Sequence, residues 1–422
     1  MRNIILLALF LMLLVSEMFG LKIGITHGLS AKNMLLYILL GGIVIDGVVN
    51  KVRAPSILSI HLNFIILILI AFISWWITDI NRPLINNLSK LERFFSLKGM
   101  LIDHYLFFLV FYYTNKTIPE TINIIKLILI LIFISTFITV IDVYDIPDLG
   151  IIKQMEHESA ANRGRVQGPL GEPNQYAVFL VLFLPAYIGL GMYAGKKKIM
   201  FIVAGVVTFI VLLLTGSRGG ILGLVSGAVI GIYSLKKSID LKKIMGSLIT
   251  LTVIASIGLS VVLYKYSNLI LGRVDSTVNA SSTTAASAGR LWIWEKGIDK
   301  MLDDPINIIL GVGWDTYAGY VGIVSHNEYL TKLFELGILG LFSYLMIFYL
   351  VFKKIKKGIL VSEDEQRIML ISFIFGYSGL LVSIFFVNLF NPWFFIWSYI
   401  GLCLRLSTLS QKKHKEKKDK LI

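Results

Sequence analysis

The sequence predicts an all-α, polytopic membrane protein with about twelve transmembrane helices. Three observations support this class. Hydrophobic residues make up 56% of the 422 residues, and the mean hydropathy is +0.78. The apolar residues come in long blocks, and lysines and arginines recur in the short segments between the blocks. Such a composition leaves little chain for a separate soluble domain.

The apolar blocks approach the length of about 20 residues that a helix needs to cross a bilayer. The first block follows Arg2 and resembles a signal peptide. No small-residue cleavage motif follows it, so we expect a retained first helix. The predicted spans are residues 3–20, 34–50, 57–80, 98–115, 120–142, 175–194, 199–216, 219–235, 244–265, 328–352, 367–390 and 393–409.

The orientation follows from the basic clusters, because positive charge marks the cytoplasmic ends of spans. The clusters at 196–198, 236–237, 242–243 and 353–357 and the tail at 412–418 all face inward if the C-terminus does. The remaining segments then face outward, namely 143–174, 216–218 and 266–327.

One segment departs from this pattern. Segment 81–97 contains Arg82, Lys90 and Arg93, although the count of spans places it outside. Two explanations are open: a block has been miscounted, or these cations serve an anionic partner. We favour the count, because the later loops agree with it.

Charge and cysteine content exclude other classes of function. The net charge of +14 resides largely in short loops and the C-terminal tail, so it does not indicate a nucleic acid partner. The single cysteine, Cys403, excludes a disulfide framework and a cysteine metal site.

The outer segment 266–327 is the largest polar stretch. Residues 276–289 are small and polar, which is typical of a flexible loop. A helix in the headgroup zone is predicted to begin at Arg290, and the following Gly311-Val-Gly313 is predicted to form a tight turn. The apolar residues on one face of this helix are Leu291, Trp294, Ile298, Met301 and Leu302.

The tetrad Ser325-His326-Asn327-Glu328 closes this segment and opens an apolar block. Ser325 and Glu328 have the spacing of a capping box, which predicts Ser325 as the N-cap and His326 in the first turn. The positive end of the helix disfavours a charged imidazole. His326 is therefore predicted to be neutral and able to act as a general base. The alternative is a histidine that only caps the helix or lies among headgroups.

Arginines are predicted at the same face. Arg218 lies between two apolar blocks joined by almost no loop, and Gly219, Gly223, Gly227 and Gly231 then recur every four residues. This glycine face permits close helix packing, which would hold Arg218 in place. An ordinary snorkelling arginine is the alternative.

The turn-rich segment 161–174 brings Arg163, Arg165 and Asn174 to the entrance of a span, unless it is a plain loop. Guanidinium groups donate bidentate hydrogen bonds that suit phosphate oxygens. No Asp-x-Asp or His-rich cluster accompanies them on the outer face. We therefore expect chemistry on a lipid-linked phosphate, with no metal and no cofactor.

The chain resembles the O-antigen ligase and O-antigen polymerase (Wzy-like) family over residues 160–345. The resemblance rests on short motifs in a fairly specific order, and the first 150 residues contribute only similar hydropathy. The motifs are Arg163-Gly-Arg165, Gly171-Glu-Pro-Asn174, Thr215-Gly-Ser-Arg-Gly219, Gly289-Arg290 with Trp294, Gly311-Val-Gly313, Ser325-His-Asn-Glu-Tyr-Leu330 and Glu335-Leu-Gly-Ile-Leu-Gly340.

The resemblance implies an inverting, metal-independent glycosyltransferase of the GT-C type in the bacterial cytoplasmic (inner) membrane, with its active site on the extracytoplasmic face. The donor would be a glycan on undecaprenyl or another polyprenyl pyrophosphate. His326 would deprotonate the acceptor sugar, and Arg165, Arg218 and Arg290 would bind the pyrophosphate. Membrane lipids, flippase proteins and chain-length regulators are the other partners that it implies. Further candidate contacts are Arg163, Asn174, Asn327 and Glu328.

The expected organisation has three parts: N-terminal helices over 1–150, a catalytic region over 151–355, and C-terminal helices with a basic tail over 356–422.

The leading hypothesis is a polymerase that joins lipid-linked repeats into O-antigen, capsular polysaccharide or exopolysaccharide. A close alternative is a ligase that moves glycan onto lipid A-core or another acceptor. A flippase or transporter is a second alternative, because Asp46 and Asp103 lie within or near spans. A third alternative is a non-enzymatic scaffold protein of the cell envelope, but a scaffold would not explain why the arginines converge on one face.

Overall fold

The computed structural model describes residues 2–19, 24–26, 29–49, 57–81, 89–143, 165–193, 195, 198–236, 289–390 and 392–420. The predicted span 244–265, residues 276–288 of the predicted loop 276–289, and Arg163 lie outside these residues.

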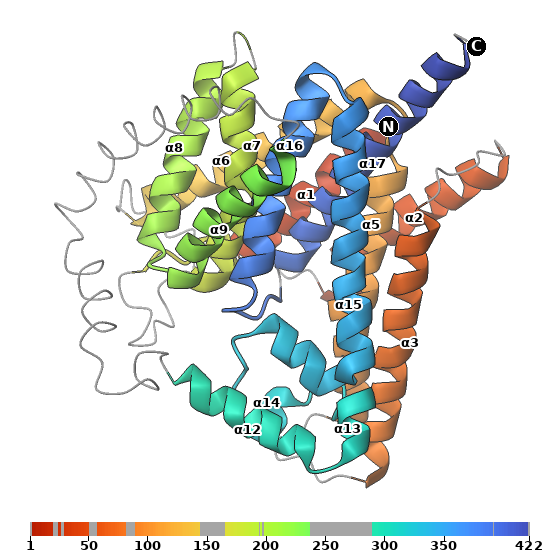
Figure 1. Cartoon of the computed structure of the whole chain (residues 1–422), viewed down its shortest axis with the longest axis vertical. Coiled ribbons are helices and arrows are strands. Elements are labelled where there is room, and N and C mark those ends of the chain that lie inside the picture. The colour runs from red at the N-terminus through yellow and green to blue at the C-terminus, as the bar shows by residue number, and fades with distance from the viewer. Residues whose placement is uncertain are drawn as a thin grey trace.

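The described residues are almost entirely helical, which confirms the predicted all-α class (Figure 1). The exception is a small antiparallel hairpin of β1 (Gly24–Thr26) and β2 (Leu29–Ser30). Two short helices also occur, η1 (Lys98–Ile102) and η2 (Gly168–Leu170). The α-helices are α1 (Arg2–Phe19), α2 (Ala31–Val49), α3 (Leu58–Asn81), α4 (Lys90–Leu97), α5 (Asp103–Tyr113), α6 (Ile118–Val143), α7 (Pro173–Tyr193), α8 (Lys198–Leu214), α9 (Arg218–Leu235), α12 (Arg290–Leu302), α13 (Pro305–Leu310), α14 (Tyr317–Val321), α15 (Glu328–Val361), α16 (Asp364–Ser383) and α17 (Pro392–Asp419).

Eight helical stretches among the described residues are long and apolar enough to cross a membrane, so the count of about twelve spans is not confirmed. Helix α8 and the apolar part of α1 are shorter. Many apolar side chains on the outer faces of α2, α3 and α9 are exposed, as expected of surfaces that face lipid. The chain is therefore a multi-pass membrane protein.

Segment 81–97 is partly helix. Helices α4, η1 and α5 form one continuous span over Lys90–Tyr113, so the basic residues at 90–97 belong to its first turns. The Lys90 ammonium lies 4.4 Å from the ring centroid of Trp76, and Arg93 is buried. Trp314 Nε1 donates a hydrogen bond to Ser96 Oγ (3.4 Å). This contact places α4 at the same end of the molecule as the outer segment, as the count of spans predicts.

Glycine determines how closely α9 packs on α16. The side of α9 formed by Gly223, Gly227 and Gly231 faces α16, which itself presents Gly379. A Cβ atom at Gly227 would lie 2.7 Å from the backbone nitrogen of Gly379. The predicted small-residue face is thus confirmed, and it fixes the helix that begins with Arg218.

Replacing Gly227 with alanine is expected to destabilise the protein by about 1–3 kcal/mol, because the two backbones must separate. Gly41→Ala is the matched control, since a Cβ at Gly41 on α2 would meet no atom within 4 Å. Thermal unfolding in detergent measures both variants. Equal unfolding temperatures for the two variants would contradict this packing.

Helix α15 is interrupted at Gly337, where φ is 65° and ψ is −171°. The chain after α13 packs into this break: Val312 N donates to Phe334 O (2.7 Å), and Ser74 Oγ donates to Glu335 O (2.6 Å). Gly311 ends α13 with φ 82°, as the predicted turn requires. A side chain at Gly311 or Gly337 would overlap the opposing backbone. The two glycines therefore interlock the outer segment with α15.

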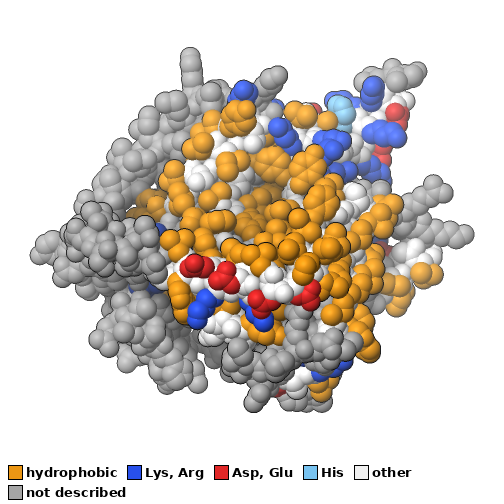
Figure 2. Space-filling view, turned by 60° about the horizontal axis from the view of Figure 1, so that its bottom comes forward, with side chains coloured by type: hydrophobic (Ala, Val, Ile, Leu, Met, Phe, Trp, Pro, Cys, Tyr) orange, Lys and Arg blue, Asp and Glu red, His pale blue; other side chains and the backbone are white. Residues whose placement is uncertain are grey.

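Helices α12, α13 and α14 form a layer at one end of the bundle, opposite the marked N- and C-terminal ends (Figure 1). The predicted helix from Arg290 is confirmed, but its apolar residues divide between two sides. Met301 is buried with Ile293, whereas Leu291, Ile298 and Leu302 are exposed. Figure 2 shows acidic and basic side chains as a band among apolar ones at this end. This mixture is typical of a helix at a membrane interface.

Candidate functional site

Segments far apart in sequence meet at this end of the bundle. Trp294 of α12 donates through Nε1 to the Ser325 carbonyl (2.8 Å), which ties the interfacial helix to the histidine-bearing turn. Glu328 N at the start of α15 donates to Ile384 O (2.9 Å), which ties the same turn to the segment after α16. The turn over residues 325–328 is therefore held from two sides.

Helix α15 begins later than the capping-box pattern predicts. Its N-cap is Asn327, whose side chain accepts a hydrogen bond from Leu330 N (3.1 Å). The prediction of Ser325 as N-cap, with His326 and Asn327 in the first turn, is wrong. His326 precedes the helix and has φ 52°, a left-handed conformation that is uncommon outside glycine.

Ser325 is unavailable as a cap because it joins a buried polar network. Its Oγ accepts a hydrogen bond from Asn327 N (3.0 Å) and lies 2.6 Å from Thr331 Oγ1 and 3.0 Å from Asn388 Oδ1. The Asn388 amide donates in turn to Thr331 Oγ1 (2.7 Å). This network fixes the backbone on both sides of His326, and nothing in the sequence pattern pointed to Asn388.

His326 lies in a mixed electrostatic environment. Burial lowers the pKa of its imidazole below the usual 6.5, and the positive charge of Arg290 lowers the pKa further, while the carboxylate of Glu172 opposes both. Burial also lowers the pKa of Arg290, as does the neighbouring Arg218, again opposed by Glu172. Arg290 therefore lies within electrostatic reach of Arg218, His326 and Glu172, and the imidazole is neutral near pH 7.

Glu172 is the member of this group that sequence reasoning missed. Its carboxylate accepts hydrogen bonds from Gln175 N (2.6 Å) and from Asn174 Nδ2 (2.7 Å), so it is fixed at the start of α7. The available signal was its place in the motif Gly171-Glu-Pro-Asn174, directly before a span.

Arg165 is buried and occupied by protein groups. Its Nε donates to the carbonyl oxygen of Thr215 (2.7 Å), and its Nη2 donates to Asn174 Oδ1 (2.9 Å). Thr215 belongs to the tight turn that leads into α9, where Ser217 Oγ accepts from Gly220 N (3.2 Å) as the N-cap. Arg165 and Asn174 therefore link Glu172 to this turn.

Arg218 is the first residue of α9, and its side chain is exposed at the end of the bundle. Glycine packing fixes the helix behind it, and the bonds of Arg165 fix the turn in front of it. Its guanidinium is thus presented from a rigid turn, which suits the binding of an anion in a defined place.

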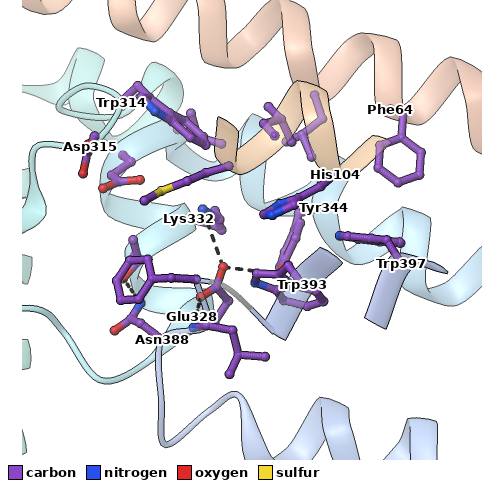
Figure 3. Close-up of a pocket in the computed structure, with 18 residues that line it drawn as sticks. Phe64, His104, Trp314, Asp315, Glu328, Lys332, Tyr344, Asn388, Trp393 and Trp397 are labelled. Carbon is purple, nitrogen blue, oxygen red and sulfur yellow. Dashed lines mark hydrogen bonds and ion pairs between the residues drawn. The ribbon is translucent and has the colours of Figure 1, made fainter. Parts of the chain in front are cut away.

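Glu328 contacts a different set of residues. It is buried, and it forms an ion pair with Lys332 (3.5 Å) and accepts a hydrogen bond from Leu389 N (3.2 Å). It lines a cavity together with Asn388 (Figure 3). Within the ranges that the structure describes, no three histidine, cysteine, aspartate or glutamate side chains form a group that could hold a metal ion.

The fold and site define a polytopic helical membrane protein in which Arg290 lies near both Arg218 and His326 at one end of the bundle. Residues 203–345 match the family model described as O-antigen ligase. The match covers about a third of the chain, and it supports the resemblance of this membrane protein to the O-antigen ligase, Wzy-like family. The matched segment includes Arg218, Arg290 and His326. No curated protein matches the chain.

The charges around His326 predict how activity depends on pH. A reaction that needs neutral His326 slows as the pH decreases through the pKa of that imidazole. The fall in rate on the acidic side of the pH–rate profile is therefore expected below pH 6.5. Glu172→Gln removes the negative charge that raises the pKa of His326, so this fall in rate is expected to move to lower pH. The exposed Glu295→Gln on α12 is the control. Rates measured from about pH 4 to 8 test the shift. A fall in rate that moves to higher pH in Glu172→Gln would contradict the placement.

Proposed function

We propose that this protein is a glycosyltransferase that polymerises oligosaccharide repeat units carried on a polyprenyl pyrophosphate. The acceptor hydroxyl attacks the anomeric carbon of the donor with inversion, and polyprenyl pyrophosphate leaves. The observation that carries the proposal is the electrostatic coupling of Arg290 with Arg218 and His326. Arg290 thus lies near both a second guanidinium group and a neutral imidazole, and all three residues lie in the segment that matches the O-antigen ligase family.

Each side chain has a separate part in this reaction. Arg218 and Arg290 bind the pyrophosphate, whose charge grows as the glycosidic bond breaks, and preorganised cations stabilise that growth. His326 takes the proton from the acceptor hydroxyl, which requires the neutral form that burial favours. Arg165 acts through its bonds to Thr215 and Asn174, as a residue that positions the Arg218 turn.

The polymerase assignment requires fewer kinds of substrate than the ligase assignment does. Donor and acceptor are then the same kind of lipid-linked molecule, and both reach the site from the membrane. The catalytic region is proposed to span 151–355, in the cytoplasmic (inner) membrane with the site facing outward. In a strain that lacks the gene, single lipid-linked repeats are expected to accumulate.

The second candidate function is a ligase that transfers finished glycan to lipid A-core or another acceptor. The description of the matched family favours it, and it would use the same donor and the same cationic group. Accumulation of full-length lipid-linked polymer in the deletion strain would overturn the polymerase assignment and support the ligase.

Transport of lipid-linked sugars is less well supported. The two aspartates that suggested it take part in ion pairs: Asp46 with Arg2 (2.7 Å) and Lys116 (2.9 Å), and Asp103 with Lys98 (2.9 Å). These ion pairs explain the presence of both carboxylates, so a path for transported ions is not needed to explain them.

A further inference from the structure

A cavity lies beside the start of α15, where Glu328 and Thr331 line it. Helices α3, η1, α5, α15 and α17 contribute to its wall, together with the segments before α14 and before α17 (Figure 3). The volume of the cavity is about 60 Å³, room for several ordered waters, and it opens into a wider hollow of about 690 Å³ that includes solvent. Asn388 and Glu328 line it, and Asn388 is bonded to the turn that carries His326.

Aromatic rings form much of the cavity wall. Trp393 and Trp397 stack on each other with centroids 5.5 Å apart and planes at 22°. Phe348 stacks on both of them from behind, at 6.1 and 5.8 Å. Trp314 lies at the other side, with the Lys332 ammonium 4.8 Å from its centroid. Rigid indole faces attract the weakly positive C–H faces of a ring-shaped ligand.

His104 is one of the residues that line this cavity. The side chain is buried, and its imidazole is hydrogen-bonded to the backbone of Met100. Nε2 has no hydrogen-bond partner within the residues that the structure describes. A buried polar atom of this kind is costly unless a ligand or water satisfies it. With one ring nitrogen bonded to Met100, a neutral imidazole presents Nε2 as an acceptor, which suits a hydroxyl donor.

The charged side chains that line the cavity determine which ligands it can hold. Three carboxyl groups, those of Asp315, Glu328 and Glu335, line the cavity with a single ammonium, that of Lys332. A phosphate would meet the carboxylates of Asp315 and Glu328 against the single ammonium of Lys332, in contrast to the cationic group around Arg290. A neutral hydroxylated molecule can donate to carboxylates and accept from the lysine. The charges of the two sites are therefore opposite, although only one turn separates them.

We infer that this cavity holds a neutral sugar ring of the acceptor glycan. The inference rests on the proposed function for the identity of the acceptor, whereas the binding of a sugar stands on the cavity alone. Tryptophan faces hold the ring, His104 Nε2 and the carboxyl groups take its hydroxyl protons, and the next sugar of the chain extends past Asn388 to His326. The donor pyrophosphate binds at Arg218 and Arg290.

The test measures the binding of two probes to the purified, full-length protein by equilibrium dialysis. One probe is the labelled, lipid-free repeat oligosaccharide of the host glycan, and the other is inorganic pyrophosphate. His104→Leu removes the acceptor, and we expect about three- to tenfold weaker oligosaccharide binding. His104→Gln keeps an acceptor near the same place and should restore most of the affinity. Pyrophosphate binding should not change in either variant.

Trp393→Leu is expected to weaken oligosaccharide binding at least tenfold, while the matched variant Trp76→Leu, on the exposed face of α3, binds normally. Oligosaccharide affinity that is absent in the native protein, or equal in all variants, would overturn the inference. So would a loss of pyrophosphate binding in the cavity variants. If the native protein binds the oligosaccharide through this cavity but transfers no glycan, the proposed function fails and the sugar site stands.

Discussion

Replacing His326 with alanine is expected to reduce glycan transfer by about 10²–10⁴-fold, because the acceptor hydroxyl then has no general base. Expression and membrane insertion should be unaffected, since the turn is held by Ser325, Asn327 and Asn388 rather than by the imidazole. The rate is measured with purified protein and a defined lipid-linked repeat.

The backbone of His326 requires a second variant. Its φ of 52° is unfavourable for alanine, whereas asparagine adopts this conformation more readily. His326→Asn therefore removes the base with less strain and should lose activity to the same extent. His414→Ala in the exposed tail is the control. Transfer at a normal rate by His326→Asn would show that the base has been assigned wrongly.

Replacing Arg290 with glutamine is expected to lower kcat by about 10²–10³-fold, the usual cost of removing one group that stabilises developing charge. Arg290→Lys keeps the charge but loses the planar guanidinium, so an intermediate rate is expected. The measurement is single-turnover transfer together with the affinity for a short polyprenyl pyrophosphate.

The control for Arg290 is an arginine at the opposite end of the bundle. Arg367 lies in the first turns of α16, whereas the site adjoins the segment after the last turn of that helix. Arg367→Gln should transfer glycan at the native rate. Equal losses in the Arg290 and Arg367 variants would indicate a general structural effect, and the pyrophosphate assignment would then fail.

Much of the fold could be predicted from the sequence because bilayer-spanning helices need long apolar blocks. Eleven of the twelve predicted blocks coincide with helices or parts of helices, and the twelfth, 244–265, lies outside the described residues. Helix α4 was read as loop because it is amphipathic and carries Lys90 and Arg93. Its apolar side packs on the neighbouring tryptophans, which the hydropathy of a single segment does not reveal.

The site could be predicted only in part. Arg218 and His326 lie at ends of apolar blocks, and Arg290 lies in the outer segment between two of them, so counting spans placed all three at one face. The structure brings Arg290 into electrostatic reach of the other two. Their roles stay predictions. The helix start was misplaced because Ser325 bonds to Asn388, which is 63 residues away in sequence. Glu172 and His104 were missed for a similar reason, since their significance arises from three-dimensional neighbours.

A structure of the protein with a bound short-chain polyprenyl diphosphate would show where the donor binds. We expect the diphosphate to lie between the guanidinium groups of Arg218 and Arg290, with the His326 imidazole facing the side where the sugar is attached. A diphosphate bound elsewhere, for example at the basic residues 353–357 at the other end of α15, would contradict this expectation.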